Sequence, residues 1–356
     1  MEQKQLTPRE NALIAYKHGT PAYIPTLFTD ITMIQANPTM ERYCGGQVGL
    51  DGFGVEWTYV PDAHAPMPTA GKIIFEDIAD WREYVKFPDL EAIDWEKQAE
   101  IDVHTDFMAL VAGAGIVPMA DGKSAYDEDK LILCMVINGP FERLHSMMGF
   151  ENALMAIAAD PEEFEAYIEA ASNWKIEYFK KIAKYYKVDV INAHDDYGAK
   201  DRMFMAPETW RKLIKPHLKR IVDACHEVGV IYQHHSCGYI EPIFEDLVEI
   251  GVDAIDTLQG GSNKNLEELK KKFGDKITFC GGFDNQGILE APGVTPEEIK
   301  AEYRRVVDTL APGGSYVVFP ITIGFDFVGP MLEEHFQYGM GFYAMRGEQP
   351  TVSLLK

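Results

Sequence analysis

A histidine and a cysteine end a strand-like segment of this chain, two positions apart. The segment reads VIYQHHSCG over residues 230–238. Because alternate side chains of a strand share a face, His235 and Cys237 would point to the same side. A second strand-like run, residues 277–280, ends in Cys280. If the two strands lie near each other in one barrel, an imidazole and two thiolates converge, which predicts a zinc site with one open position, as in catalytic zinc centres.

Each of these residues, taken singly, has a simpler interpretation. Free cysteine is among the most buried residue types, and a single histidine is often a hydrogen-bonded part of a core. The combination of His235, Cys237 and Cys280 at two strand ends favours the metal site over that alternative.

Charge and composition restrict the classes of partner. The chain has 356 residues, 46% of them hydrophobic and 25% charged, which is enough for a large buried core. Its net charge of -23 opposes binding to nucleic acid or to anionic lipid, since both need a positive surface. The five cysteines lack the spacing of a disulfide framework, and neither a signal peptide nor a membrane span of about 20 apolar residues is evident. We therefore expect a cytoplasmic protein with reduced thiols.

Short β-rich runs alternate with longer amphipathic segments along the chain, as in a parallel sheet built from βα units. The helical segments at 161–187 and 207–229 begin with proline and acidic residues, as helix N-termini prefer. Eight runs predict an α/β fold, a single (β/α)8 TIM barrel over residues 1–356, with residues 29–115 as an excursion or lid over its C-terminal face. The runs are residues 23–28, 116–120, 131–137, 188–193, 230–235, 254–258, 277–280 and 316–319.

Active sites of such barrels lie where the strands end, so the residues that follow the runs are candidates. Asp196 comes two residues after His194, on the same face, and the two are predicted to form a catalytic acid–base pair or to support the metal. The alternative for Asp196 is a turn-capping aspartate. Asp284 is predicted either to hydrogen-bond the substrate or to close a loop.

Several short motifs, colinear over nearly the whole chain, resemble those of the uroporphyrinogen decarboxylase superfamily. Their common order makes the resemblance strong. The motifs are TPRE at 7–10, GTP at 19–21, IP at 24–25, DGFGVEW at 51–57, GPFE at 139–142, DDYG at 195–198 and SCG at 236–238.

Within the superfamily, the chain is most similar to the branch of zinc-dependent, cobamide-linked methyltransferases. The decarboxylases carry arginines near their N-terminus that would bind the substrate carboxylates, whereas residues 26–33 here contain none. The methyltransferase branch has an H-x-C motif at its fifth strand, which His235 and Cys237 match. Its second cysteine usually follows the eighth strand, where this chain has no cysteine. The third ligand is therefore expected to be Cys280, or an oxygen of Asp196 or Asp326.

The resemblance implies methyl transfer between a small methylated substrate, such as an aryl methyl ether, and a separate corrinoid protein. This is the reaction of the first methyltransferase in an anaerobic O-demethylase system, and it implies zinc and a corrinoid (cobalamin) as cofactors. The alternatives are a corrinoid-to-thiol methyltransferase with a coenzyme M-like or homocysteine acceptor, a cobalamin-independent zinc enzyme that methylates homocysteine, a non-catalytic corrinoid- or metal-binding protein, and uroporphyrinogen decarboxylase. A homodimer is left open.

Aromatic and methionine side chains near the expected face would suit an apolar methylated substrate better than a small charged thiol. The alternative is that they belong to the ordinary core. The predicted substrate-binding residues of this kind are Phe53, Trp57, Phe141, Tyr197 and Met205.

Overall fold

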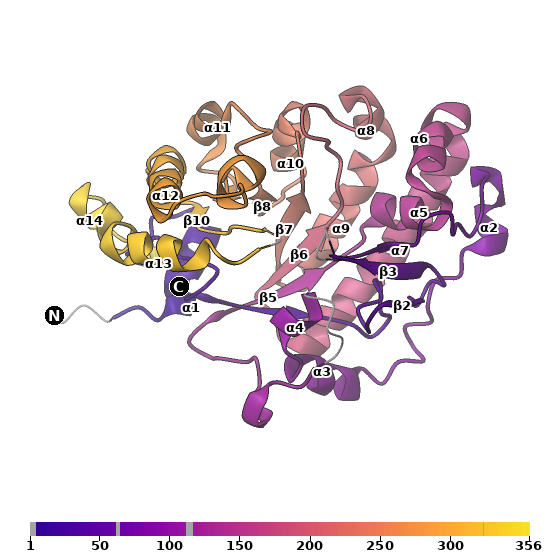
Figure 1. The fold of residues 1–356 in the computed structure, drawn as a ribbon, viewed down its shortest axis with the longest axis horizontal. Coiled ribbons are helices and arrows are strands. Elements are labelled where there is room, and N and C mark those ends of the chain that lie inside the picture. Colours follow the sequence, from indigo (N-terminus) through magenta and orange to yellow (C-terminus); the bar gives the residue numbers. More distant parts are fainter. Residues whose placement is uncertain (1–4, 62–64, 112–116, 323) are drawn as a thin grey trace.

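Parallel strands form a curled sheet at the centre of the chain, and helices surround it (Figure 1). The computed structural model describes residues 5–61, 65–111, 117–322 and 324–356. In these residues the sheet has seven strands in the order β1-β5-β6-β7-β8-β9-β10. Their bounds are β1 (Ile31–Gln35), β5 (Leu131–Val136), β6 (Val190–His194), β7 (Ile231–Ser236), β8 (Ala254–Thr257), β9 (Thr278–Cys280) and β10 (Tyr316–Val317).

The segment before β1 connects the first and last strands of this sheet. Thr26 forms a parallel bridge with Val318. The Leu27 N–H donates to the Val318 carbonyl, and the Val318 N–H donates to the Pro25 carbonyl, both at 2.9 Å. The sheet is therefore joined to itself in the manner of a TIM barrel, and the α/β barrel class predicted from the sequence is confirmed.

Two of the eight expected runs are not strands of the sheet. Residues 23–28 contain only the single bridge of Thr26. The run at 116–120 is not a barrel strand, because Pro118 bridges Thr105 in antiparallel fashion and Ala120–Gly122 form a 3-10 turn; Ile116 lies outside the described residues. Its place is taken by β1, which lies inside the range assigned to the excursion and pairs with β5.

The turn around the buried carboxylate of Asp30 explains why the sequence pattern does not indicate β1. Asp30 accepts hydrogen bonds from the Thr26 N–H at 3.0 Å and from the Tyr23 and Thr29 hydroxyls at 2.6 Å. These bonds turn the chain between the first apolar run and β1. Residues 23–28 and β1 are therefore separate segments, whereas the sequence pattern suggests one strand at 23–28 followed by irregular chain.

The helices begin largely where proline and capping residues predict them. In α7 the Asp160 side chain accepts the Glu163 N–H at 3.1 Å, and Pro161 occupies the first helical position. Within the described residues no helix is both long and apolar enough to cross a membrane. The helices are α1 (Pro8–Tyr16), α2 (Trp81–Tyr84), α3 (Trp95–Val103), α4 (Phe107–Val111), α5 (Pro140–Met148), α6 (Phe150–Ala159), α7 (Pro161–Tyr186), α8 (Pro207–Leu213), α9 (Lys215–Glu227), α10 (Phe244–Glu249), α11 (Leu266–Phe273), α12 (Pro296–Leu310), α13 (Val328–Gln337) and α14 (Phe342–Met345).

The helix expected over 207–229 is two helices. The chain breaks between α8 and α9 at Ile214, two residues before Pro216. Proline has no N–H to donate to the carbonyl four residues earlier, so a continuous helix would lose that hydrogen bond.

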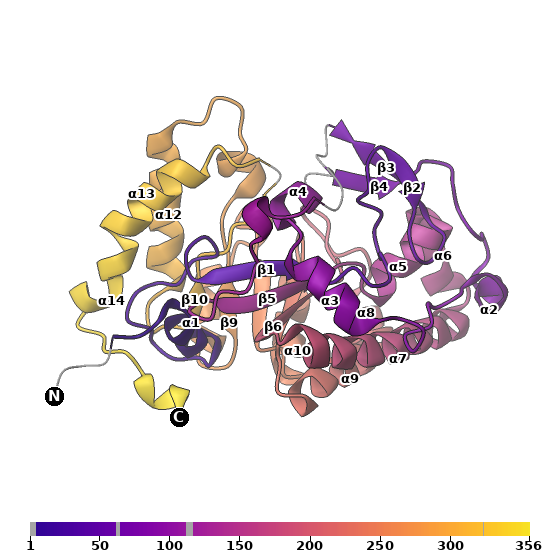
Figure 2. The same cartoon turned by 90° about the horizontal axis from the view of Figure 1, so that it is seen from below.

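The excursion after β1 contains a small antiparallel sheet of β2 (Val48–Leu50), β3 (Glu56–Val60) and β4 (Ala65–Pro68). Figures 1 and 2 show this sheet beside α5, the helix that follows β5. The excursion therefore packs at the carboxyl end of β5, where a TIM barrel has its active face.

A buried ionic network attaches the excursion to the barrel helices. Arg143 of α5 pairs with Asp51 at 2.6 Å, and Lys175 of α7 pairs with Glu41 at 2.5 Å, and the four side chains are at most 4% exposed. Arg143 also donates to the Glu41 carbonyl. Such pairs are stable only because every charge has a partner.

The same network explains the DGFGVEW motif. Asp51 accepts the Phe53 and Val55 N–H groups at 2.9 Å and the Trp57 indole N–H at 2.8 Å, besides its bond to Arg143. The aspartate thus closes the turn between β2 and β3 and holds it against α5.

We expect Asp51→Asn to reduce the free energy of unfolding by about 3–5 kcal/mol, because it removes the carboxylate nearest to the buried Arg143 charge and leaves only Glu41, at 3.8 Å. Urea denaturation followed by circular dichroism measures the change. The control is Asp223→Asn, which removes an exposed pair with Lys219 at 2.7 Å and should change stability by less than about 0.5 kcal/mol. An equal effect of both substitutions would contradict the role given to the network.

Candidate metal centre at the carboxyl end of the barrel

Three side chains of different chemistry converge where β6 and β7 end. The His235 Nε2 lies 3.4 Å from the Cys237 Sγ and 3.8 Å from the Asp196 Oδ1. One donor atom from each residue lies within 4.8 Å of the others, and in the described residues no other group of three metal-binding side chains meets this distance. In the structure His235 and Cys237 thus lie together at the end of β7. Asp196 joins them from the loop that follows the neighbouring strand β6.

Two glycines bring the loops after β6 and β7 into contact. Gly238 has φ +75, and a Cβ there would lie 2.3 Å from the Gly198 carbonyl oxygen. A Cβ at Gly198 would lie 2.6 Å from the Tyr239 backbone nitrogen. Only glycine fits at either position, and the close approach lets Asp196 accept the Cys237 N–H at 2.7 Å.

Asp256 of β8 stands behind the histidine. Its fully buried carboxylate accepts the His235 Nδ1–H at 2.7 Å, and the Asn192 and Gln233 side-chain amides at 2.7 Å each. The bond to Nδ1 leaves Nε2 of His235 directed at Cys237 and Asp196. A carboxylate behind a histidine in this way is the usual support of a metal-binding imidazole.

The electrostatics of the group favour a bound cation. Burial and the Asp196 charge raise the pKa of Cys237. Burial alone would lower the pKa of His235, but Asp256 and Cys237 raise it well above its usual value. Positive charge is thus stabilised among these atoms, and a metal ion held by His235 would take the place of the proton. The sulfur, nitrogen and oxygen donors fit zinc and leave a fourth position for another ligand.

His194, expected to pair with Asp196, lies against His235 instead. The two imidazole rings stack with centroids 3.8 Å apart, and the His194 Nε2 donates to the Asn192 side-chain oxygen at 3.0 Å. Burial and the His235 charge lower the pKa of His194 well below its usual value. His194 therefore acts in the structure as a neutral wall of the site.

Cys280, predicted as the third ligand, lies deeper in the barrel. It is fully buried, in a cluster with Leu131 and Ala254. Its thiol donates to the Gln233 Oε1 at 3.8 Å, and Gln233 precedes His235 by two positions, about 7 Å along the strand. The structure does not bring Cys280 into the group of converging ligands. Asp326, the other alternative, is exposed in the turn before α13 and is also outside the group.

The predicted aromatic and methionine contacts lie in the core. The exposed fraction is 8% or less for Phe53, Trp57, Phe141, Tyr197 and Met205. The Phe53 ring packs on Arg143 of α5, and the Trp57 indole bonds Asp51. The Tyr197 hydroxyl donates to Asp195 at 2.9 Å, so its polar end is used within the protein. Core packing therefore accounts for these side chains.

Asp284 closes a loop. Its Oδ1 accepts the Gly287 N–H at 2.9 Å, which fits the second of its two expected roles. It also lines a polar cavity of about 280 Å3 at the carboxyl ends of β8 and β9. Gln259 lines this cavity too, and its side-chain oxygen accepts the Gly238 N–H at 3.0 Å, next to Cys237. Gln259 therefore connects the cavity to the loop that carries Cys237, and none of the three converging residues lines the cavity itself.

Three residues of the site were absent from the predicted set: Asp256, Glu142 and Arg42. Glu142 accepts the Asn138 and Asp196 N–H groups at 3.1 and 3.3 Å, and burial, followed by the Asp196 charge, raises its pKa to about 7. Arg42 reaches the site from the excursion, with its guanidinium over Trp57 at 5.2 Å and its charge lowering the pKa values of Glu142 and His145. Of these three residues only Asp256 could have been found from the sequence, because it is a carboxylate inside an otherwise apolar strand-like run.

Comparison with known proteins identifies a family and proteins that are similar to this chain. The model of the uroporphyrinogen decarboxylase (URO-D) family matches residues 85–320. A methylated-thiol–coenzyme M methyltransferase of Methanosarcina mazei is 24% identical over 229 residues, which cover 64% of this chain and 56% of the relative. The chain thus spans little more than half the length of that relative. A solved structure, a methyltransferase from Methanosarcina mazei, matches with a TM-score of 0.55 at 15% identity, over 94% of this chain and 99% of that chain, and is similar in fold.

The position of Cys280 generates a prediction about metal binding. After dialysis against zinc, Cys237→Ser and Asp196→Ala should each lose most of the bound metal, because each removes one of the converging donors. Cys280→Ser should keep it. Elemental analysis measures the zinc content, and Cys225→Ala, at a buried cysteine of α9, is the control. Loss of zinc from Cys280→Ser as complete as from Cys237→Ser would reverse the ligand assignment.

Proposed function

The chain belongs to the uroporphyrinogen decarboxylase family, and we propose that it is a zinc-dependent methyltransferase that works with a separate corrinoid protein. The observation that carries the proposal is the convergence of Asp196, His235 and Cys237, with Asp256 behind the histidine. Both relatives that the comparisons give are methyltransferases, which supports the same branch of the family.

Decarboxylation of a porphyrinogen suits the chain less well. Residues 26–33 contain no arginine, and the net charge of -23 disfavours a substrate with many carboxylates. The sulfur and imidazole donors would have no evident task in that reaction.

Zinc bound by these residues would supply a Lewis acid that keeps a thiol ionised at neutral pH, or withdraws charge from a leaving heteroatom. The protein's own part is to hold the donors. Asp256 fixes the orientation of the His235 ring, and Asp196 accepts the Cys237 N–H and so fixes the position of the cysteine. His194 covers one face of the His235 ring and excludes water from it.

The substrate that suits this site is a small thiol or methylated thiol. The aromatic side chains expected to bind an aryl ether are packed in the core, whereas the cavity lined by Gln259, which bonds the Gly238 N–H, is polar and has a volume of about 280 Å3. This is less than the roughly 300–1,000 Å3 of sites for drug-sized ligands. The curated relative is named for a methylated-thiol substrate. The residues that line the cavity are Lys200, Gln259, Gly261, Ser262, Lys264, Asp284, Asn285, Gln286 and Gly287.

A spectroscopic assay tests the proposed reaction. With a cobalt(I) corrinoid protein, addition of a methylated thiol should convert the cobalt(I) spectrum to that of methylcobalt(III), and an aryl methyl ether should do so at least about tenfold more slowly. A chelator or Cys237→Ala should abolish the change, and Cys225→Ala should not. Demethylation without any corrinoid, or decarboxylation of uroporphyrinogen, would overturn the proposal. A faster reaction of the ether would overturn only the substrate class.

Asp256→Asn tests the support of the metal ligand. We expect a 10- to 100-fold loss of zinc affinity, of the order found when such supporting carboxylates are removed. Asparagine keeps one acceptor oxygen, which the Asn192 and Gln233 amides occupy, and its NH2 group cannot accept the His235 Nδ1–H. Competition with a chromophoric chelator measures the affinity. Asp102→Asn is the matched control, since Asp102 is a carboxylate of α3 that is only 2% exposed and accepts the Asn37 N–H at 2.8 Å. Equal affinities of the two variants would remove Asp256 from the site.

A further inference from the structure

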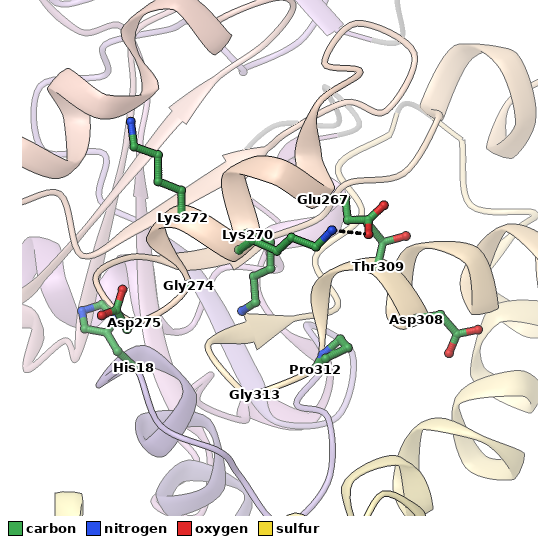
Figure 3. Close-up of a pocket in the computed structure, with 11 residues that line it drawn as sticks. His18, Glu267, Lys270, Lys272, Gly274, Asp275, Asp308, Thr309, Pro312 and Gly313 are labelled. Carbon is green, nitrogen blue, oxygen red and sulfur yellow. Dashed lines mark ion pairs between the residues drawn. The ribbon is translucent and has the colours of Figure 1, made fainter.

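A cavity of about 680 Å3 lies at the opposite end of the barrel from the metal centre. The turns that form it follow α1 and α11 and precede β9 and β10, so it opens at the amino-terminal ends of the strands (Figure 3). Its lining residues are His18, Glu267, Lys270, Lys271, Lys272, Gly274, Asp275, Asp308, Thr309, Pro312 and Gly313.

Lys270 differs from the two lysines that follow it. Its side chain points into the cavity in Figure 3, and the residue is only 8% exposed. Lys271 and Lys272 are exposed and form ion pairs, with Glu267 at 2.8 Å and with Glu245 at 2.9 Å. The Lys270 Nζ instead donates to two backbone carbonyls, those of Gly314 at 2.5 Å and Ser315 at 3.2 Å.

These two carbonyls suit a neutral amine. Burial lowers the pKa of Lys270 to about 7, because the hydrogen-bonded partners of its Nζ carry no negative charge. A neutral amine has two N–H groups and one lone pair. With both N–H groups donated to the carbonyls, the lone pair is directed away from these two oxygens, and the residue lines the cavity. A desolvated lysine of this kind is a nucleophile near neutral pH.

We infer that Lys270 is a modification site that accepts an acyl group from a small acyl phosphate entering this cavity. The Nζ lone pair forms a bond to the acyl carbon, and the bond from that carbon to the phosphate oxygen breaks. The phosphate leaves with the electron pair, and the nitrogen gives one proton to water. The product is an amide that still has one N–H for a backbone carbonyl.

The charged groups around the cavity are mixed in sign. Lys271 and Lys272 at its rim are each paired with a glutamate, and their remaining N–H groups can be donated to the phosphate oxygens. The volume of about 680 Å3 leaves room for the donor. The other titratable groups that face Lys270 or influence its charge are His18, Glu267, Asp275, Cys280, Asp308 and Glu348.

Site-resolved acylation of the full-length protein tests this inference. The protein is incubated with acetyl phosphate at pH 7.5, and early acetylation of each lysine is measured by mass spectrometry of peptides. Lys270 should react about tenfold or more faster than Lys272, since an ordinary lysine is almost wholly protonated at this pH. Its rate should level off above about pH 8, where the amine is already neutral. Equal or slower reaction of Lys270 would overturn the inference.

Two further comparisons separate the fold's contribution from local sequence. In urea the advantage of Lys270 over Lys272 should disappear. Thr309→Phe, which fills the cavity and keeps the amine, should slow Lys270 and leave Lys272 unchanged, with Lys271→Arg as the control that keeps the fast site. An advantage that persists in urea, or that Thr309→Phe leaves intact while thermal unfolding shows a folded protein, would show that the cavity is not responsible.

Discussion

The carboxylate of Asp256 is the buried group on which the order of the candidate metal centre depends. A negative charge inside a barrel is costly unless hydrogen bonds or an opposite charge compensate it. Asn192 and Gln233 each donate one N–H, and His235 donates the third. The Tyr16 hydroxyl donates in turn to Gln233 at 2.6 Å, so a chain of bonds runs from α1 up to the histidine. The side chains of three neighbouring strands are thereby fixed before any metal binds, which is the condition for a precise site.

Much of the fold follows from local sequence. Proline and acidic residues marked the start of α7, and six of the eight apolar runs correspond to β5–β10. The predictions of structure that were wrong concern features that depend on tertiary contacts or on a single proline. The bonds of Asp30 divide the first run and conceal β1, and Pro216 divides a helix whose apolar pattern is continuous. The attachment of the excursion through Asp51 and Arg143 joins residues far apart in sequence, and no local period can indicate it.

The candidate site shows the same division. His235 and Cys237 are two positions apart on one strand, so their common direction follows from strand geometry alone. The approach of Asp196 depends on how the loops after β6 and β7 pack, and Arg42 arrives from the excursion. Cys280 ends its strand as expected. Because barrel strands are tilted, the end of one strand can lie level with the interior of another, and Cys280 lies level with Gln233. Strand order and tilt are properties of the whole barrel, which a single strand does not encode.

The bridge between Thr26 and Val318 has a consequence for the order in which the chain becomes structured. Residues near the start of the chain complete the sheet only by pairing with residues near its end. During synthesis the segment around Thr26 therefore leaves the ribosome long before Val318 is made. Until then its backbone groups are unpaired and the apolar interior beside it is exposed to water. Contacts of such long sequence separation are formed late and slowly. An incomplete chain that stops before β10 would present an open edge, the feature of a sheet that most readily pairs with another molecule.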